Sequence, residues 1–283
     1  MEVIKKIKDL KIIEQKRPIA LIPTMGNLHD GHLSLIKKAK NLKLNSLVTI
    51  FVNPLQFGPD EDFKKYPRTT FEDMTKLEKQ NCDFLYLPEK TELLSGIKYL
   101  KAPLSSYLCG NKRPGHFDGV ITIVNRFLEL INPEYCLFGQ KDFQQQLIIK
   151  NHLEKNKFST ELILGPTVRN DNGLALSSRN NYLSYKERNH ASLIFKYLNQ
   201  IADDLKKYKS NNKKNFLFKA SSLCEKYKEK FEEKGFEIDY LEIVNAKNLK
   251  KLTEGDSDLL IAISAFFKNV RLIDNLNLKL PPS

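Results

Sequence analysis

The sequence predicts an α/β protein with a doubly wound parallel sheet, followed by a smaller α+β domain. Short buried apolar runs alternate with amphipathic segments up to about residue 167, as in parallel sheets whose strands are joined by helices. After Arg179 this pattern gives way to two helical segments and then to alternating strand-like segments. A chain of 283 residues with 41% hydrophobic residues can build two such cores. We therefore expect domains over residues 1–180 and 181–283.

The expected first domain has five buried strands with helices between them. The strands are predicted over residues 19–25, 46–53, 84–88, 135–139 and 162–167. The helices are predicted over residues 31–43, 69–80, 117–131 and 143–156. Such sheets bind ligands beyond the carboxyl ends of their strands, so the segments that follow the strands are the first candidates for a site.

The expected second domain begins with two helices and ends with a small antiparallel sheet. Ser184 and Glu187 form a capping box, which predicts a helix from there to about residue 208. A polar linker over residues 210–214 precedes a second helix, and Gly235 is a suitable residue to end it. Strands are predicted over residues 236–245, 258–266 and 270–278.

The basic composition raises nucleic acid as a possible partner, but the kind of cation argues against it. The chain has 46 Lys+Arg against 34 Asp+Glu, which gives a net charge of +12. Eight of these cations are arginine, and the 38 lysines are spread along the whole chain. Arginine's donor fork suits phosphates and bases, whereas scattered lysine is typical of a solvated surface. We expect no nucleic-acid partner, with an RNA-binding footprint as the alternative.

Leader, membrane and cysteine patterns favour a cytoplasmic protein. Residues 1–17 carry lysine throughout and no apolar run, unlike a signal peptide. The apolar stretch at 259–267 is too short to span a bilayer, so no membrane partner is expected. The four cysteines, Cys82, Cys109, Cys136 and Cys224, contain no C-x-x-C pair. We therefore expect reduced, buried thiols and no protein-bound metal.

The segment 23–32 (PTMGNLHDGH) leaves the first predicted strand and opens a helix. Helix N-termini attract anions through unpaired N–H groups and the positive end of the helix dipole. His29 and His32 lie three residues apart, where two neutral imidazoles can donate hydrogen bonds to phosphate oxygens, and Gly31 allows close approach. This pattern predicts a nucleotide site. A metal half-site and two ordinary loop histidines are the alternatives.

The common phosphate-binding loops are absent from the sequence. No G-x-G-x-x-G motif occurs, and residues 110–115 have the glycine spacing of a P-loop without the Lys and Ser/Thr that should follow. A nucleotide would therefore be held by the histidine-containing turn.

The segment 51–57 (FVNPLQF) ends the second predicted strand with two carboxamides, Asn53 and Gln56, among apolar residues. A carboxamide both donates and accepts hydrogen bonds, which suits the carboxylate or hydroxyl of a small substrate. An ordinary Asn-Pro turn is the alternative.

Two later segments add further polar groups. Segment 139–145 (GQKDFQQ) joins a strand to a helix; Lys141 can bind phosphate, and Asp142 is expected to cap the helix. Segment 169–180 (RNDNGLALSSRN) is a polar loop at the domain boundary that can fold over a triphosphate. Alone, the first could be a simple capped helix and the second an ordinary linker. Together with the two earlier segments they favour a binding site.

Six motifs in this order resemble the pantothenate synthetase (pantoate–β-alanine ligase) family, and the resemblance spans the chain. They are PTMGNLHDGH at 23–32, IFVNPLQF at 50–57, YPRT at 66–69, RPGHF at 113–117, FGQKDFQQ at 138–145 and GLALSSRN at 173–180. The H-x-G-H element alone marks only the wider nucleotidyltransferase group, which includes class I aminoacyl-tRNA synthetases. The ordered series is far more specific.

The resemblance implies a Rossmann-like nucleotidyltransferase domain and an AMP-forming acid–amine ligase of pantothenate biosynthesis. The carboxylate of pantoate attacks the α-phosphorus of ATP, giving pantoyl adenylate and pyrophosphate. The amine of β-alanine then releases AMP and pantothenate. A carboxylate is already ionised at pH 7, so the first half needs no general base. Mg²⁺ is expected with ATP, mainly through phosphates and water, and the family implies a homodimer.

The resemblance also implies roles for single residues. His32 is expected to donate a proton to phosphate oxygens, assisted by His29 and Lys141. Gln56 and Gln145 are expected to hold pantoate with Asn53 nearby, and Gln56 also contacts β-alanine. The implied ATP-binding residues are Met25, Gly26, Asn27, Leu28, His29, Asp30, Gly31, His32, Gly139, Gln140, Lys141, Asp142, Val168, Leu176, Ser177, Ser178 and Arg179.

Three positions depart from what many members show. Gln140 stands where glutamate is frequent and Leu176 where methionine is common, but both positions contact ligands mainly through the backbone in the family. Cys109 lies where some members have glutamate, which leaves open what pairs with Arg113.

Other function classes fit the sequence less well. A nucleotidyltransferase that stops at an adenylated product shares the same motifs. A tRNA-charging enzyme needs an anticodon-reading domain, for which the residues after the boundary leave little room. An RNA-binding module needs arginines and exposed aromatic side chains together on one face. The sequence therefore favours the ATP-dependent ligase.

Overall fold

The computed structural model describes residues 1–211 and 215–280, and contacts divide the chain into two compact units. The first unit contains Met1–Ser105 and Arg113–Val168, and the second contains Ser106–Lys112 and Arg169–Ser283. The second unit thus begins earlier than residue 181, because Arg169 is bound by Asp274 of that unit. The division into domains 1–180 and 181–283 stays a prediction.

The first unit is built on a six-stranded parallel sheet with the order β1-β4-β3-β2-β5-β6. Its strands are β1 (Glu2–Ile4), β2 (Ile19–Thr24), β3 (Asn45–Ile50), β4 (Phe84–Tyr86), β5 (Tyr135–Gly139) and β6 (Glu161–Gly165). From β2 the chain adds β3 and β4 on one side, then β5 and β6 on the other. The order therefore reverses between β2 and β5, which is the switch point at which doubly wound sheets bind ligands.

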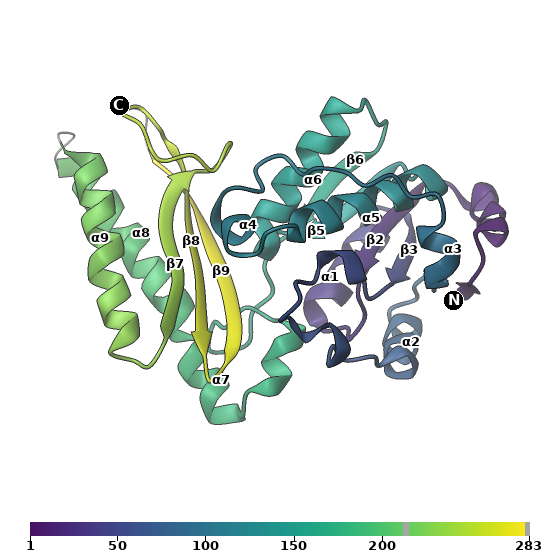
Figure 1. The fold of residues 1–283 in the computed structure, drawn as a ribbon, viewed down its shortest axis with the longest axis horizontal. Coiled ribbons are helices and arrows are strands. Elements are labelled where there is room, and N and C mark those ends of the chain that lie inside the picture. Colours follow the sequence, from purple (N-terminus) through teal and green to yellow (C-terminus); the bar gives the residue numbers. More distant parts are fainter. Residues whose placement is uncertain (212–214, 281–283) are drawn as a thin grey trace. The chain divides into compact units, whose positions relative to one another are not determined.

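Helices cover both faces of this sheet (Figure 1). On one face α1 (Asp30–Asn41) and α2 (Thr70–Lys79) pack against Ile22 and Val48. On the other face Phe127 of α5 (His116–Ile131) meets the ring of Tyr86, with 6.2 Å between the ring centroids. The strands are buried on both sides, which is why the sequence presents them as continuous apolar runs. The predicted doubly wound parallel sheet is confirmed.

The remaining elements of the first unit include a predicted helix, α6 (Phe143–Lys155), and several short elements that the sequence did not reveal. The short elements are the 3₁₀ helices η1 (Ile7–Lys16), η2 (Pro54–Gln56), η3 (Asp62–Lys64) and η4 (Gln140–Asp142), and the α-helix α3 (Lys90–Leu94). Strand β1 and helix η1 were not predicted because lysines interrupt their apolar pattern. Leu10 and Ile13 of η1 are nevertheless buried.

The second unit is a three-stranded antiparallel sheet packed against two long helices (Figure 1). The strands are β7 (Glu237–Asn245), β8 (Asp258–Phe267) and β9 (Val270–Lys279), and the helices are α8 (Leu193–Asn211) and α9 (Phe216–Glu232). Leu198, Leu223, Phe231 and Ile261 belong to the buried core between them. Three shorter helices complete the unit, namely α4 (Leu108–Lys112), η5 (Ser178–Tyr182) and α7 (Tyr185–Ala191).

The helical part of the second unit differs from the prediction in two respects. The capping box of Ser184 and Glu187 is present, but the helix it starts ends at Ala191 and a new one begins at Leu193. The Ser192 hydroxyl donates to a backbone carbonyl three residues earlier, a local bond that competes with the helical ladder. Helix α8 reaches Asn211, so the expected linker is helical at its start; residues 212–214 lie outside the described residues. Gly235, at φ 79°, follows α9 as predicted.

The four cysteines are buried and free, as predicted. Burial raises the pKa of the thiols of Cys82, Cys136 and Cys224, which makes them unreactive structural groups. Over residues 1–211 and 215–280, no helix has the length and apolar character needed to cross a bilayer.

Candidate functional site

Three of the segments that the sequence singled out, and the single residue Val168, follow four neighbouring strands of the first unit. Asn53 and Gln56 follow β3, residues 25–32 follow β2, residues 139–142 end and follow β5, and Val168 follows β6. Because β3, β2, β5 and β6 are parallel neighbours, these segments emerge at the same carboxyl edge, on both sides of the switch point. The first unit thus brings together the candidate residues that it contains.

Residues 25–32, here called the histidine turn, form an unusual helix cap. His29 is the N-cap of α1, and its Nδ1 accepts a hydrogen bond from the Gly31 N–H at 3.1 Å. The Nδ1 of His32 accepts one from the His29 N–H at 3.3 Å. Both halves of a capping box are therefore made by histidine rings, a role that usually belongs to Ser or Thr and Glu or Gln.

This cap determines which nitrogen of each ring carries the proton. An Nδ1 that accepts a backbone N–H bond holds no hydrogen, so in a neutral ring the hydrogen is on Nε2. The rings of His29 and His32 lie with centroids 4.1 Å apart and planes at 36°. The pair therefore offers two Nε2–H donors. A metal half-site would instead need an Nε2 lone pair.

The surroundings keep both rings neutral. Burial, together with the positive charges of Lys141 and Lys76, lowers the pKa of His32 to about 4. Burial, the neighbouring His32 ring and the same two lysines hold the pKa of His29 well below its usual range. Both imidazoles are thus neutral hydrogen-bond donors at pH 7, the form that the sequence analysis required.

Glycine is needed at two positions of the histidine turn. A Cβ on Gly31 would lie 2.8 Å from Nδ1 and Cε1 of His29, so only glycine leaves room for the ring to fold back on the helix. Gly26 has φ 82°, in the left-handed region, and a Cβ there would lie 3.0 Å from Ile50.

Two side chains of α2 that were not predicted as site residues bind the backbone of the histidine turn. The carboxylate of Asp73 is completely buried and accepts the N–H groups of Asn27 at 2.8 Å and Leu28 at 2.7 Å. The Lys76 ammonium donates to the Leu28 carbonyl at 2.7 Å. One signal was available in the sequence: Asp73 precedes the buried Leu77 by four residues, which puts the charge on the core-facing side of the helix.

The segment after β5 carries the predicted phosphate-binding lysine. Lys141 lies half-buried in η4, and Gln145 lies half-buried in the first turn of α6. The expectation that Asp142 caps this helix is wrong in its detail. Asp142 occupies the N-cap position, but its side chain makes no capping hydrogen bond and is exposed. The reason is that η4 runs directly into α6, so the cap residue lacks the extended backbone that turns a side chain back onto the helix.

The two carboxamides after β3 are bonded to each other. Asn53 is buried, and its Nδ2 donates to Gln56 Oε1 and to the Gly119 carbonyl, both at 3.0 Å. Its Oδ1 accepts the Leu55 N–H at 3.0 Å, which caps η2. Asn53 is thus a support for the turn, and Gln56 is the half-buried amide beside it.

A chain of polar contacts through Arg113 and His116, the first residue of α5, supports this turn. The Arg113 guanidinium binds Glu61 through two bonds of 2.6 and 2.5 Å and, against the effect of burial, holds the pKa of that carboxyl below its usual value. The Nη1 of Arg113 lies 3.0 Å from Nε2 of His116, whose Nδ1 lies 2.8 Å from the Gln56 carbonyl. Since guanidinium only donates, Nε2 accepts and Nδ1–H donates to Gln56.

The partner of Arg113, which the sequence left open, is therefore Glu61. Cys109, in the second unit, instead contacts the hydroxyl of Tyr240 at 3.0 Å and the guanidinium of Arg271 at 3.6 Å.

In the second unit, residues 169–175 form a braced loop. Arg169 makes two bonds to the buried Asp274, at 2.5 and 2.9 Å, and its guanidinium lies 3.6 Å from the centroid of the Phe195 ring. Arg169 also donates to the Gly173 carbonyl and pairs with Ala175 in an antiparallel bridge. The start of this segment is thus fixed by an ion pair, a ring contact and backbone pairing.

The remaining predicted ATP residues, Leu176, Ser177, Ser178 and Arg179, follow that loop. Ser177 is the N-cap of η5 and accepts the Arg179 N–H at 3.3 Å. Asn180 closes the segment by donating to the Ala175 carbonyl at 3.0 Å. Their contact with a nucleotide stays a prediction.

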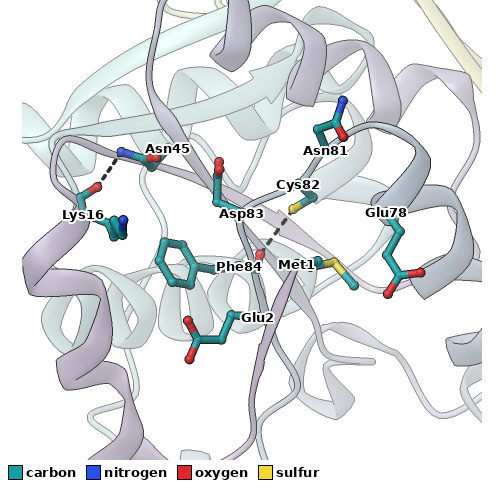
Figure 2. Close-up of a pocket in the computed structure, with 9 residues that line it drawn as sticks. All are labelled: Met1, Glu2, Lys16, Asn45, Glu78, Asn81, Cys82, Asp83 and Phe84. Carbon is teal, nitrogen blue, oxygen red and sulfur yellow. Dashed lines mark hydrogen bonds between the residues drawn. The ribbon is translucent and has the colours of Figure 1, made fainter.

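A separate hollow of about 440 Å³ lies at the opposite, amino edge of the sheet (Figure 2). Two of its polar side chains, Asp83 and Asn45, bond within the protein. The Asp83 carboxylate accepts bonds from Lys40 and Ser46, and Asn45 donates to the Lys16 carbonyl at 2.6 Å. Doubly wound sheets bind ligands at the carboxyl edge, so the candidate site is the one around the histidine turn.

Comparison with known proteins gives a consistent result. The family model described as pantoate–β-alanine ligase matches residues 2–277. The pantothenate synthetase of Pseudomonas fluorescens (strain Pf0-1) is 40% identical over 291 residues, which cover 99% of this chain and 99% of that protein.

Two solved structures resemble the chain over nearly its whole length. The pantothenate synthetase of Thermus thermophilus has a TM-score of 0.85 at 33% identity, covering 98% of this chain and 99% of that one. The pantoate–β-alanine ligase of Francisella tularensis, complexed with β-γ ATP and β-alanine, has a TM-score of 0.77 at 32% identity, covering 98% and 97%. The chain is therefore an enzyme of the ligase class and belongs to the pantoate–β-alanine ligase family.

Proposed function

We propose that the enzyme joins (R)-pantoate to β-alanine at the expense of ATP, through a pantoyl-adenylate intermediate, releasing pyrophosphate and then AMP. The observation that carries the proposal is the neutral histidine pair at the switch point, with two Nε2–H donors between a carboxamide segment after β3 and a lysine segment after β5. The relative from Francisella tularensis, complexed with β-γ ATP and β-alanine, supports the choice of substrates.

In the first half, a carboxylate oxygen of pantoate attacks the α-phosphorus, and the bond from that phosphorus to the bridging oxygen of pyrophosphate breaks. Negative charge grows on the phosphate oxygens while this happens. His32 and His29 donate Nε2–H bonds to that charge, and Lys141 adds a point charge on the same side. No base is needed, because the nucleophile is already ionised. Catalysis therefore rests on alignment and charge stabilisation.

In the second half, the neutral amine of β-alanine attacks the acyl carbon of the adenylate, the acyl–oxygen bond to AMP breaks, and the amine loses a proton to solvent. Gln56 and Gln145 hold the pantoyl group through their amides, and Asn53 fixes the position of Gln56. Gln56 also contacts β-alanine. These contacts place the amine and the acyl carbon together.

ATP is assigned to the histidine turn, to residues 139–142, to Val168 and to residues 176–179. Mg²⁺ enters with the triphosphate and is held mainly by phosphate oxygens and water. Asp30 and Asp142, both exposed, have the oxygen donors that Mg²⁺ prefers and fit contacts through its water ligands. A homodimer is a further assignment and rests on family resemblance alone. A cytoplasmic location is another, and it rests on the cysteine pattern and composition described above.

ATP–pyrophosphate exchange with a panel of carboxylic acids tests the proposal. Pantoate should support exchange without β-alanine, because the adenylate forms reversibly. AMP should accumulate only after β-alanine is added. Exchange that no carboxylic acid stimulates, together with no AMP when β-alanine is present, would exclude this reaction.

A further inference from the structure

The backbone of the histidine turn surrounds a buried negative charge. Gly26 and Asn27 both have positive φ, at 82° and 50°, which turns successive N–H groups toward one point. Such concave arrangements of backbone amides bind anions. In this chain the anion is built in: Asp73 Oδ2 accepts the Asn27 N–H and Oδ1 accepts the Leu28 N–H.

Other contacts fix Asp73 and the turn to the same helix. The Thr69 hydroxyl donates to Asp73 Oδ2 at 3.1 Å, so that oxygen has two donors. Lys76, one helical turn further on, binds the carbonyl of Leu28, whose side chain is itself buried in the core. Leu28, the residue before His29, is thus fixed by contacts to its N–H, its carbonyl and its side chain.

Asp73 has no route to a substrate. Its exposure is 0%, and both carboxylate oxygens are bonded to protein donors. Asp73 therefore cannot bind a reactant or take a proton from it. It can act only through the turn it holds, where the next residue is His29 and both imidazole rings use Nδ1 on the backbone of the same cap.

We propose that Asp73 and Lys76 are positioning residues of the active site, and that together they orient the Nε2–H donors of His29 and His32 toward the reacting phosphate. This inference rests on the proposed function for the identity of the reaction, but not for the geometry. The backbone N–H groups of Asn27 and Leu28 are bonded to the Asp73 carboxylate, so they do not bind the phosphate. The phosphate is bound by the histidine rings instead.

Asp73→Asn is the sharpest test. Asparagine keeps the size of the side chain but places an NH₂ group toward either Asn27 N–H or Leu28 N–H, whichever way the amide is turned. One donor then faces another donor, and the peptide must move. A displacement near 1 Å costs about 10²-fold in rate, so kcat of pantoate-dependent exchange should fall about 10²-fold. KM for pantoate should stay within about twofold, because no pantoate contact is touched.

Asp83→Asn is the matched control. Asp83 also accepts a backbone N–H, a hydroxyl and a lysine, but at the amino edge of the sheet (Figure 2). Both variants should lower the melting temperature, and only Asp73→Asn should lower kcat. If Asp73→Asn does not fold, Lys76→Met is the test variant instead. It removes the hydrogen bond to the Leu28 carbonyl and keeps a side chain of similar length. We expect its kcat to fall about tenfold.

Amide hydrogen exchange separates this inference from the proposed reaction. In Asp73→Asn the peptide containing Asn27 and Leu28 should exchange at least about tenfold faster than in the wild type, and in Asp83→Asn it should not. Faster exchange in an enzyme whose wild type lacks pantoate-dependent activity would leave the positioning role standing and overturn the reaction. A lower melting temperature with kcat within threefold of the wild type would overturn the positioning role.

Discussion

Replacing Gly31 by alanine should separate activity from stability. The added Cβ would lie 2.8 Å from Nδ1 and Cε1 of the His29 ring, whereas ordinary contact begins near 3.4 Å. The ring must therefore retreat by about 0.6 Å or more. Its hydrogen bond from the residue 31 N–H is already 3.1 Å long and would be lost.

The two effects on stability nearly cancel. Alanine is favoured over glycine inside a helix by roughly 0.5–1 kcal/mol, and loss of an N-cap bond costs about 1 kcal/mol. The free energy of unfolding of Gly31→Ala should thus stay within about 1 kcal/mol of the wild type. The rate should not, because a donor moved by most of an ångström costs about 10²-fold.

The assay is pantoate-dependent ATP–pyrophosphate exchange, run beside urea unfolding. Gly58→Ala is the control, since a Cβ there would meet only Glu61 at 3.7 Å, an ordinary contact, and both activity and stability should be kept. Exchange by Gly31→Ala within threefold of the wild type would refute the view that the ring orientation of His29 matters. A loss of stability above about 3 kcal/mol would refute the cancellation.

Three further predictions concern His32 and the braced loop. His32→Ala should lower the exchange rate by roughly 10²–10³, the scale for losing one preorganised donor, and near-normal turnover would remove His32 from its role. Because folding lowers the pKa of His32 to about 4, the unfolded chain binds its proton first as pH falls below about 6.5. In urea unfolding, this residue should therefore lower the free energy of unfolding by about 2 kcal/mol between pH 7 and pH 5. His32→Gln should abolish that part of the pH dependence. The same pH dependence in His32→Gln and the wild type would contradict the prediction. Asp274→Asn leaves Arg169 without its buried partner and should destabilise by about 3 kcal/mol in thermal unfolding; a cost below 1 kcal/mol would show the pair to be dispensable.

The strands and main helices could be predicted because their apolar residues follow simple periods. The one strand of the six-stranded sheet that was not predicted is β1, which has three residues and lies in a lysine-rich segment without such a pattern. The interruption at Ser192 was not predictable from the capping box, which marks where a helix begins and says nothing of where it ends.

The candidate site was predictable as segments and not as a geometry. That the segments of Asn53, His29 and Lys141 follow neighbouring strands requires the strand order, which local sequence does not contain. The tautomers of His29 and His32 depend on the direction of two backbone N–H groups, and these exist only in the folded cap. Asp73 looked like one more charge on a helix, because its partners lie about 45 residues away in the sequence.

The strand order has a consequence for how the substrates meet. Neighbouring strands lie about 4.8 Å apart, so the segments after β3, β2 and β5 leave the sheet at points one strand width from each other. The backbone hydrogen bonds of the sheet therefore set the spacing between the segment of Asn53 and Gln56, the histidines and Lys141. Substitutions in the loops can change which acid or nucleotide is held, but the distance over which the reactants must approach belongs to the fold.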